Sequence, residues 1–258
     1  MCGELAKEVF QTKILGKHRV SYLLCPRCGL LQTEEPYWLD EAYTSPINMS
    51  DTGILVRNMY LQKVASTLIY SFFDTDGTFV DAAGGYGLFV RLMRDVGFDF
   101  YWSDKYTQNL FARGFEWDKN HKPRVELVTC FEAFEHFVNP MVEIKELLRI
   151  SKNILFTTEL LPAPTPEPNA WWYYGLGHGQ HIAFYSPQTL QYIARAFNAN
   201  LYSVGSLHLL TEKNLNRLSF SWITRTSKRG LFTFVRKKMN SRTMEDMVSM
   251  SKKTEGRF

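Results

Sequence analysis

The sequence predicts an α/β fold, a doubly wound and mostly parallel sheet with helices on both faces. Short apolar runs alternate with stretches of helical periodicity between residues 52 and 210, as expected of consecutive βαβ units. A glycine-rich turn joins one of these runs to a helix, at the position where doubly wound sheets bind ligands. The 258 residues, 45% of them hydrophobic and 22% charged, suffice for one large core and exclude a disordered or fibrous chain.

The predicted elements follow one another from residue 52 onward. Apolar residues at helical spacing predict a first helix over 52–73. After a turn we expect alternating strands and helices, with strands at 78–82, 100–103, 125–130 and 153–157 and helices at 88–96 and 140–150. Ser186 and Pro187 are typical of an N-cap and a first helical turn, so a helix is expected from there to 197. A late strand is expected over 201–210, and four prolines make 161–169 an irregular loop.

Charge and composition divide the chain into three predicted parts, residues 1–46, 47–224 and 225–258. The last part carries a net charge of +7, whereas residues 1–224 carry −3, so no nucleic-acid groove is expected in the body. A partial apolar stripe in the basic tail is compatible with docking on the body or on a second subunit of a homodimer. No apolar run reaches the ~20 residues of a membrane span. Without a secretory leader the chain is expected to be cytoplasmic.

The N-terminal part contains half of a zinc-knuckle motif. Cys25 and Cys28 stand in the sequence Cys-Pro-Arg-Cys-Gly, in which two thiolates two residues apart can reach one metal ion. Cys2 resembles the second cysteine of a partner pair, and His18 could supply a further ligand, although its spacing does not favour it. The sequence therefore leaves two alternatives open: a bound zinc ion, or an incomplete knuckle packed on the main domain.

The stretch 79–88, FVDAAGGYGL, combines a strand, an acid, a glycine-rich turn and a helix. Glycines at such a turn let a ligand approach the backbone closely. A dinucleotide site requires G-x-G-x-x-G/A, and here Val90 stands at its third position. A methyltransferase loop has an acid at the strand end and then G-x-G-x-G. The chain matches this second pattern, with Ala83 in place of the first glycine.

Further features follow in the order expected of a methyltransferase. Asp104 lies 23 residues after Asp81, and an acid about 20 residues beyond such a loop can accept hydrogen bonds from ribose hydroxyls. Residues 127–136 contain an E-x-x-E-H pattern after a strand, and 186–197 would be the helix after an active-site loop. Through these motifs, residues 47–208 resemble the class I S-adenosylmethionine (SAM)-dependent methyltransferases. The resemblance implies a Rossmann-like sheet of seven strands, the last one antiparallel.

The resemblance also implies roles for single residues. The methionine end of SAM would be bordered by Asp81, Ala83, Gly84, Gly85 and Gly87. Asp104 would hold the ribose, and the adenine edge would lie near Lys105 and Tyr106. The residues expected to lie against the cofactor at the end of the fourth strand are Phe131 and Glu132.

The loop 171–181, WWYYGLGHGQH, is the expected acceptor site, because it follows the fifth strand and should cover the carboxyl ends of the strands. Its aromatic residues can stack on a sugar or another flat face; they are Trp171, Trp172, Tyr173 and Tyr174. His178 and His181 titrate near neutrality and are candidate general bases. Glu135, His136 and Glu159 are alternative bases. Structural roles remain open for all of them, with the aromatic residues packing the loop and the histidines serving as hydrogen-bonded core residues.

The sequence thus predicts a SAM-dependent methyltransferase with a small-molecule acceptor. Methyltransferases with an N-terminal C-x-x-C…C-x-x-C segment include sugar C-methyltransferases, and the chain resembles them, which favours a sugar, nucleotide sugar or glycan. The visible residues leave C-, O- and N-methylation open. The alternative hypothesis is an inactive methyltransferase-like scaffold that carries a zinc-knuckle interaction module. An NAD-linked oxidoreductase is disfavoured by Val90.

Overall fold

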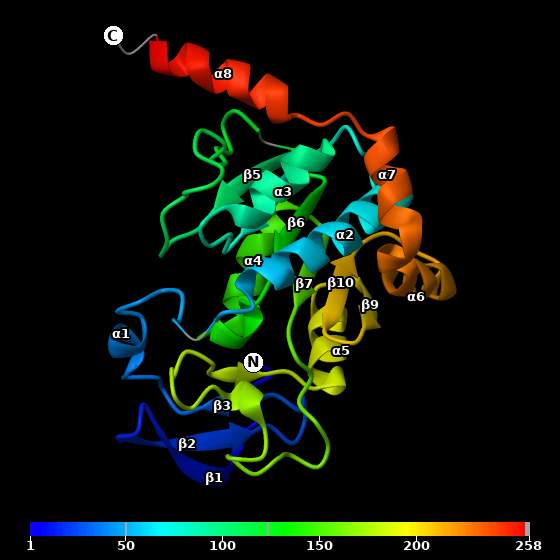
Figure 1. Ribbon diagram of the computed structural model, residues 1–258. Coiled ribbons are helices and arrows are strands. Elements are labelled where there is room, and N and C mark those ends of the chain that lie inside the picture. Colours follow the sequence, from blue (N-terminus) through cyan, green and yellow to red (C-terminus); the bar gives the residue numbers. More distant parts are fainter. Residues whose placement is uncertain (50, 123, 256–258) are drawn as a thin grey trace. The chain divides into compact units, whose positions relative to one another are not determined.

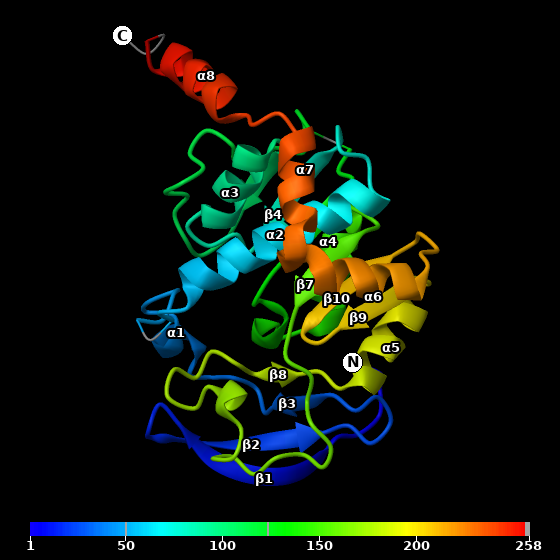
Figure 2. The same ribbon diagram turned by 45° about the vertical axis from the view of Figure 1, so that its right-hand side comes forward.

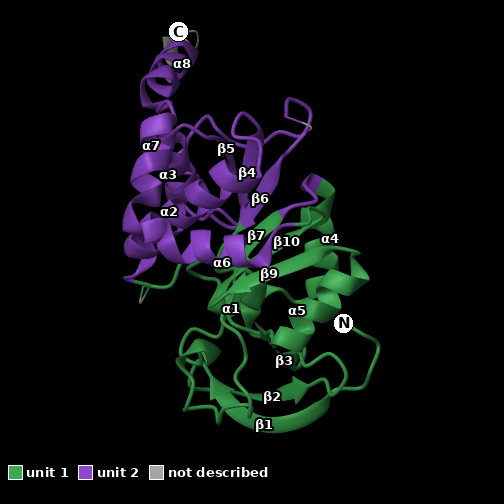
Figure 3. Cartoon of the chain, turned by 90° about the vertical axis from the view of Figure 1, so that its right-hand side faces the viewer, with its two compact units in different colours: residues 1–51, 130–149, 154–214 green, residues 52–129, 150–153, 215–258 purple. Residues whose placement is uncertain are grey.

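A computed structural model describes residues 1–49, 51–122 and 124–255 (Figure 1). The chain forms two compact units, each built from several stretches of sequence (Figure 3). Unit 1 contains residues 1–51, 130–149 and 154–214, and unit 2 contains residues 52–129, 150–153 and 215–258. The division into residues 1–46, 47–224 and 225–258 stays a prediction about the organisation of the chain. None of the described helices is both long enough and apolar enough to cross a membrane.

Unit 2 is built on three parallel strands, with β4 (Thr78–Ala82) between β5 (Asp99–Ser103) and β6 (Leu127–Cys130). Helix α3 (Leu88–Val96) connects β4 to β5, and α2 (Ile54–Phe72) packs on α3. The strands read as short apolar runs because their side chains are buried on both faces of a parallel sheet. The predicted strand and helix at 78–82 and 88–96 are confirmed to the residue.

Unit 1 contributes β7 (Ile154–Thr157), β9 (Asn200–Val204) and β10 (Leu207–Thr211), in which β10 runs antiparallel to both neighbours. Its helices are α4 (Pro140–Ile150) and α5 (Pro187–Ala196). Helix α5 begins as expected from the sequence: the Ser186 hydroxyl accepts a hydrogen bond from the Thr189 amide at 3.1 Å, and a capping box is complete.

The prediction of one late strand over 201–210 is wrong, because the segment forms the hairpin of β9 and β10. Gly205 adopts a φ of +61° between the two strands, a conformation that glycine takes without steric cost in a two-residue hairpin turn. The glycine followed by Ser206 was the sequence signal for this turn. The apolar residues on both sides of the turn form one nearly continuous run, which predicts a single strand.

The described strands of the main sheet follow the order β5-β4-β6-β7-β10-β9, which makes a mixed sheet of six strands. The resemblance implied seven, and within the described residues no further strand lies beside β5. A single parallel bridge between Trp102 and Glu116 occupies that edge instead. The segment around Glu116 is rich in Asp, Asn, Lys and Gly, residues that are depleted in strands, which explains why the pairing stops after one bridge. The antiparallel last strand, β10, is confirmed.

The N-terminal residues form a second sheet in unit 1, which the sequence did not predict. Its order is β1-β2-β3-β8, all antiparallel, with β1 (Lys7–Ile14), β2 (His18–Leu24), β3 (Leu31–Thr33) and β8 (Ala183–Phe184). The cysteine turn lies between β2 and β3, and the short helix α1 (Leu39–Ala42) follows β3. Aromatic and aliphatic side chains bury one face of this sheet; they include Ile14, Val20, Tyr22, Trp38, Tyr174 and Phe184. β8 was missed because its two residues are too few for a periodicity.

The chain ends in a helical extension of unit 2, with α6 (Arg217–Thr226), a π-helical segment η3 (Ser227–Leu231), α7 (Phe232–Lys238) and α8 (Thr243–Glu255). Helices α6 and α7 and segment η3 pack on α2. The backbone kinks at Arg229 and Gly230 inside η3, so α6 and α7 point in different directions (Figure 2).

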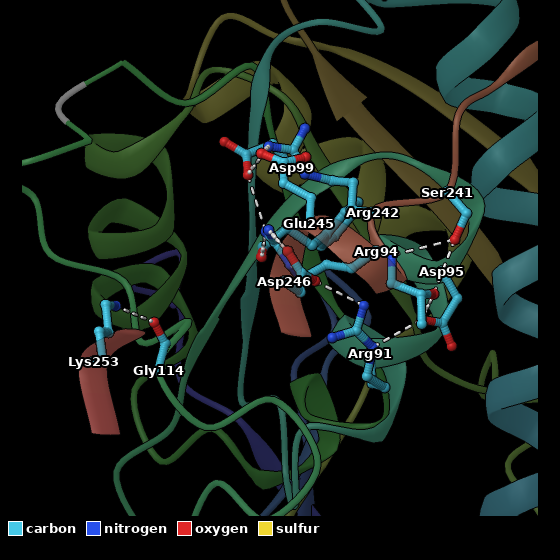
Figure 4. A network of polar contacts seen from close by, with 12 residues as sticks. Arg91, Arg94, Asp95, Asp99, Gly114, Ser241, Arg242, Glu245, Asp246 and Lys253 are labelled. Atoms are coloured by element: carbon cyan, nitrogen blue, oxygen red, sulfur yellow. Dashed lines mark hydrogen bonds and ion pairs between the residues drawn. The ribbon is translucent and has the colours of Figure 1, made fainter. Parts of the chain in front are cut away.

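An ion network fixes α8 to the rest of unit 2 (Figure 4). Arg94 donates to both carboxylate oxygens of Asp246, at 2.8 Å and 2.7 Å, and also to Asp99 at 2.9 Å. Arg91 donates to Asp246 at 2.8 Å. Burial opposes ionisation of Asp246, but the hydrogen bonds from the two arginines outweigh it and lower the pKa of this carboxyl. Arg242 also pairs with Asp99, and Thr243 donates to Asp95, so α8 is held on unit 2 by several polar contacts around Asp246.

Candidate functional site

The glycine-rich loop after β4 has the backbone that its sequence requires. Ala83, Gly85 and Gly87 have φ values of +56°, +53° and +82°. Such values suit glycine, and an alanine there costs roughly 1 kcal/mol, so the Ala83 departure from the motif is a strained residue that keeps the loop conformation. A Cβ atom on Gly84 would lie 2.9 Å from Trp102, and one on Gly87 would lie 2.4 Å from the Asn109 side chain. Larger residues are therefore excluded at both positions.

Asp104 binds this loop directly. One carboxylate oxygen accepts a hydrogen bond from the Gly85 amide at 3.0 Å, and the other accepts from the amides of Tyr106 and Thr107 at 2.7 Å and 2.9 Å. The Gly85 carbonyl in turn accepts from the Thr107 hydroxyl at 2.7 Å and from the Trp102 indole at 2.8 Å. We call this set of contacts the Asp104 clasp. It ties Asp104 to the glycine loop that follows Asp81 and fixes the conformation of that loop.

Asp81 lies fully buried at the end of β4, with only 3% of its surface exposed. Its carboxylate accepts a hydrogen bond from the Thr129 hydroxyl at 2.6 Å. Burial raises the pKa of Asp81 to about 7, the Thr129 contact lowers it in part, and the charge of Asp104 raises it further. A buried carboxylate held at this pKa would be stabilised by a cationic ligand group. The methionine end of SAM carries an ammonium group, so the residues present fit this cofactor.

The two residues expected after the fourth strand, Phe131 and Glu132, lie in unit 1. Glu132 has a φ of +51°, so, like Ala83, it is a non-glycine residue in the left-handed region. Its amide donates to the Thr157 hydroxyl at 2.8 Å, and that hydroxyl donates to the Glu132 carboxylate at 2.7 Å. This double contact joins the ends of β6 and β7 and accounts for the unusual backbone of Glu132.

Four of the five residues predicted as candidate bases come together in unit 1, namely Glu135, His136, His178 and His181; Glu159 is not among them. The rings of His136 and His181 lie 5.0 Å apart, and those of His178 and His181 lie 4.7 Å apart. A side-chain ligand atom from each of Glu135, His136 and His181 lies within 4.8 Å of the others. Glu135 and His136 belong to the 3-10 turn η1 (Phe134–His136). We call these four residues the histidine cluster. Its members come from two separate stretches of the chain, residues 135–136 and 178–181.

Hydrogen bonds fix the tautomers of the cluster. The Nδ1 of His181 donates to the Tyr173 carbonyl at 2.7 Å, which leaves Nε2 as the nitrogen that can accept a proton. The Nδ1 of His178 accepts from the Gln180 amide at 3.1 Å. The Tyr43 hydroxyl lies 2.8 Å from Nδ1 of His136.

All three imidazoles are held neutral. Burial lowers the pKa of His136 to about 4, with a further contribution from His178. Burial also lowers the pKa of His181 well below its ordinary value, and the neighbouring His136 and His178 add to this effect. Burial alone lowers the pKa of His178. Neutral imidazoles are proton acceptors at neutral pH, so the cluster is in the state that a general base requires.

The aromatic acceptor loop divides into buried and exposed rings. Tyr173 and Tyr174 are 2% and 0% exposed and pack in the core of unit 1, and Trp171 lies against both of them. Trp172 is 76% exposed. The two tyrosines, and in part Trp171, therefore pack the loop onto the core. Trp172 remains available to a ligand. A larger residue does not fit at Gly175 in this loop, because a Cβ atom there would lie 2.3 Å from the His178 ring.

The three N-terminal cysteines also come together. The sulfur atoms of Cys2 and Cys25 are 3.4 Å apart, and a ligand atom from each of Cys2, Cys25 and Cys28 lies within 4.8 Å of the others. Burial raises the pKa of the Cys28 thiol to about 12. Burial acts the same way on Cys25, but hydrogen bonds from the Cys28 amide and Cys2 outweigh it and lower the pKa. His18 contacts Glu41 at 2.9 Å instead.

Sequence reasoning missed two residues of the histidine cluster's surroundings. Tyr43 reaches His136 from the end of α1, and the Gln180 side chain donates to the carbonyls of Ala42 and Ser45 at 2.8 Å and 3.1 Å. The first contact joins the N-terminal segment to η1 and the second joins it to the acceptor loop, each across more than 90 residues of sequence. Nothing local to Tyr43 indicated them, because the N-terminal segment read only as a zinc knuckle.

The fold and the glycine loop define a Rossmann-like methyltransferase. A family profile described as a methyltransferase domain matches residues 57–204, more than half of the chain. The chain belongs to this methyltransferase family, which confirms the predictions of a SAM-dependent methyltransferase and of SAM as its cofactor. No curated protein matches the sequence.

The chain is also similar to solved methyltransferase structures, at low sequence identity. Magnesium protoporphyrin IX methyltransferase from Synechocystis, with bound S-adenosylhomocysteine, is 12% identical over 67% of this chain and 90% of its own, with a TM-score of 0.42. A SAM-dependent methyltransferase from Thermotoga maritima is 13% identical over 68% of this chain and 100% of its own, with a TM-score of 0.45. An O-methyltransferase family protein from Burkholderia thailandensis is 14% identical over 67% and 66% of the two chains, with a TM-score of 0.39.

Proposed function

We propose that this methyltransferase methylates a small acceptor that must lose a proton, and that the acceptor is a sugar, a nucleotide sugar or a glycan. The observation that carries the proposal is the histidine cluster, in which three neutral imidazoles and Glu135 gather beside the acceptor loop. Methyl transfer itself needs mainly positioning. Buried side chains that can take a proton are useful only where the pKa of the molecule to be methylated is too high for it to react unaided.

The proposed cofactor residues divide between two functions. The methionine end would be held by the loop residues Asp81, Ala83, Gly84, Gly85 and Gly87. Asp104 would bind the ribose hydroxyls, and the remaining predicted cofactor residues would lie along the adenine and the cofactor face, namely Lys105, Tyr106, Phe131 and Glu132. The rigidity of the Asp104 clasp supports this assignment, because a preformed loop binds its ligand without an ordering cost.

We assign the general base to His181. SAM, when bound, supplies an electrophilic methyl group on a sulfonium. Nε2 of His181 accepts the acceptor's proton, and the Tyr173 carbonyl, which holds Nδ1–H at 2.7 Å, stabilises the imidazolium that forms. The Glu135 carboxylate lies next in the cluster and can stabilise the positive charge that His181 gains. The acceptor atom, an oxygen or a carbon beside a carbonyl, would keep the electron pair that bonds to the methyl group supplied by SAM, with S-adenosylhomocysteine as the leaving group.

Trp172 supports a carbohydrate acceptor. A large aromatic ring that is 76% exposed on a loop beside a proton-accepting cluster is suited to stacking against the C–H face of a sugar. Trp171, packed on Tyr174 with centroids 5.0 Å apart, would hold the base of the loop. The residues do not distinguish C-methylation from O- or N-methylation.

The test of this function is a two-step assay of the full chain. Calorimetric titration with SAM, S-adenosylhomocysteine and NAD should give binding of the first two and none of NAD. An acceptor screen with methyl-labelled SAM then begins with nucleotide sugars, with phenols and amines as the competing classes. Transfer to phenols or amines alone would contradict the carbohydrate proposal while leaving the methyltransferase in place. Trp172→Ala should raise KM for a sugar acceptor at least tenfold without changing SAM affinity.

We also propose that Cys2, Cys25 and Cys28 bind one zinc ion. The clustering of their sulfur atoms supports the site, since zinc takes thiolate ligands at about 2.3 Å in a tetrahedral set. Elemental analysis of the purified protein should then give zinc close to one per chain, and Cys25→Ser should abolish it. Cys130→Ser, a buried thiol outside this group, is the matched control and should keep the metal.

A further inference from the structure

The segment from residue 213 to 244 has a charge pattern unlike the rest of the chain. It contains nine Lys or Arg residues and no Asp or Glu, and it spans α6, η3 and α7 in unit 2. Neither the glycine loop nor the histidine cluster draws a residue from it. We call its solvent-facing side the basic helical surface. Figure 2 shows α7 in front of α2, with α6 continuing from its end.

The basic helical surface has an apolar centre. On α6, Phe220 and Ile223 are buried toward the α2 side, whereas Leu218 and Trp222 are 82% and 62% exposed. Leu218, Trp222 and Arg225 follow the spacing i, i+4 and i+7, so they line one face of the helix, opposite the buried one. The protein thus presents a large aliphatic and a large aromatic side chain to solvent, next to a cation.

Four of the cations around this centre lack acidic partners among the described residues. Arg225, Arg229, Arg236 and Lys237 are exposed and form no ion pair with any described residue. Elsewhere in unit 2 the arrangement is opposite, because the cations facing α8 are bound by Asp246 and Asp99. The positive field of the basic helical surface is therefore not neutralised within the described chain and remains available to an external anion.

We propose that the basic helical surface binds the headgroups of an anionic phospholipid membrane, with α6 lying in the plane of the interface. A helix that exposes Leu and Trp between basic residues matches the composition of interfacial helices, whose apolar side chains enter the boundary of headgroups and acyl chains while cations bind lipid phosphates. Trp is favoured at this depth because its ring is apolar and its N–H is polar. The exposed Leu218 and Trp222 favour a lipid surface over a nucleic acid, since a phosphate backbone requires the cations alone.

The proposal is tested by sedimentation of the full chain with vesicles. Vesicles of phosphatidylcholine with about 30% phosphatidylglycerol should bind the protein, and pure phosphatidylcholine vesicles should bind it at least tenfold more weakly. Binding should decrease as salt rises, because the surface charges are screened. Each basic residue at an anionic surface contributes roughly a fivefold change. The triple variant Arg225→Glu, Arg229→Glu and Lys237→Glu should therefore lose on the order of 100-fold in partitioning.

A second variant separates the apolar from the electrostatic contribution. Leu218→Ser with Trp222→Ser should lose about tenfold in binding to the anionic vesicles, given the area that two such side chains bury. The matched control is Val142→Ser with Lys145→Glu, an exposed apolar residue and an exposed lysine on α4, which should bind as the wild type does. Circular dichroism and SAM affinity check that each variant is folded.

Three results would overturn the proposal. The first is equal binding to neutral and anionic vesicles. The second is tighter binding of a 20-base-pair duplex than of anionic vesicles, with no effect of the serine variant, which would make the surface a nucleic-acid site. The third is a concentration-dependent dimer in sedimentation velocity that Trp222→Ser dissolves, which would assign the surface to a second copy of the chain.

Discussion

Replacing Asp81 by asparagine should stabilise the unliganded protein at alkaline pH and weaken its hold on SAM. The carboxyl of Asp81 is buried at the end of β4 and accepts a 2.6 Å hydrogen bond from Thr129. Asparagine has the same shape, can accept the same hydrogen bond, and carries no charge. The Asp81→Asn variant therefore isolates the cost of keeping a negative charge in this position.

The size of the effect follows from the pKa of Asp81, about 7 in the folded protein against an ordinary value of 3.8. Because the folded state holds this proton more tightly than the unfolded state, the free energy of unfolding falls as pH rises from about 4 to about 7 and is level above that. A gap of about three pH units corresponds to about 4 kcal/mol. We expect Asp81→Asn to exceed the wild type by about 1–4 kcal/mol at pH 8 and to match it near pH 4.

The assay is urea unfolding followed by circular dichroism at several pH values between 4.5 and 8.5. Asp76→Asn, at an exposed carboxyl in the turn before β4, is the matched control and should show no pH-dependent difference from the wild type. A variant less stable than the wild type at pH 8, or a difference that does not grow with pH, would refute the reasoning. Calorimetry should show at least tenfold weaker SAM binding by Asp81→Asn, since the carboxylate that we propose for the ligand's ammonium is gone.

Three other variants test the site and the tail. Asp104→Ala should weaken SAM binding by roughly 10–100-fold because the ribose contact and the clasp are both lost, and a folded variant with wild-type affinity would contradict the assignment. His181→Gln should lower kcat by about 10²–10⁴-fold at unchanged SAM affinity, and the acid limb of the wild-type profile should lie well below pH 6.5 because the pKa of His181 is lowered. Asp246→Asn should cost about 1–3 kcal/mol in urea unfolding, because Arg94 loses one of its two carboxylate partners and keeps Asp99, whereas exposed Glu245→Gln should cost almost nothing.

The main sheet was predictable because local patterns and tertiary structure agree there. The buried strand β4, the glycine turn and helix α3 each carry a local signal, and all three were predicted with their boundaries. The hairpin of β9 and β10 was not, because its turn at Gly205 is flanked by apolar residues that continue the same pattern. The N-terminal sheet was missed because residues 1–46 were interpreted only as a zinc knuckle, and its edge strand β8 is a two-residue strand far along the chain.

The candidate site, like the fold, was predictable only in part. Asp81, the glycines and Asp104 follow a spacing that the sequence displays, and the Asp104 clasp brings them together. His178 and His181 were expected as bases, with Glu135 and His136 as alternatives to them, but their convergence was not expected. It depends on η1 lying beside the acceptor loop, where the Ile182 amide donates to the Glu135 carbonyl at 2.8 Å. Tyr43 could not be predicted, since its contact with His136 is set by tertiary packing alone.

The pairing of β8 with β3 limits how this enzyme can be divided or recombined. The acceptor loop ends in a strand of the N-terminal sheet, and Trp38 and Leu15 of that segment also hydrogen-bond to its Gly179 and Leu176 carbonyls. A chimera that exchanged only the loop, or only the N-terminal segment, would lose these hydrogen bonds and the pairing of β8 with β3. Altered acceptor preference, in evolution or in the laboratory, therefore requires the two stretches to change as a pair.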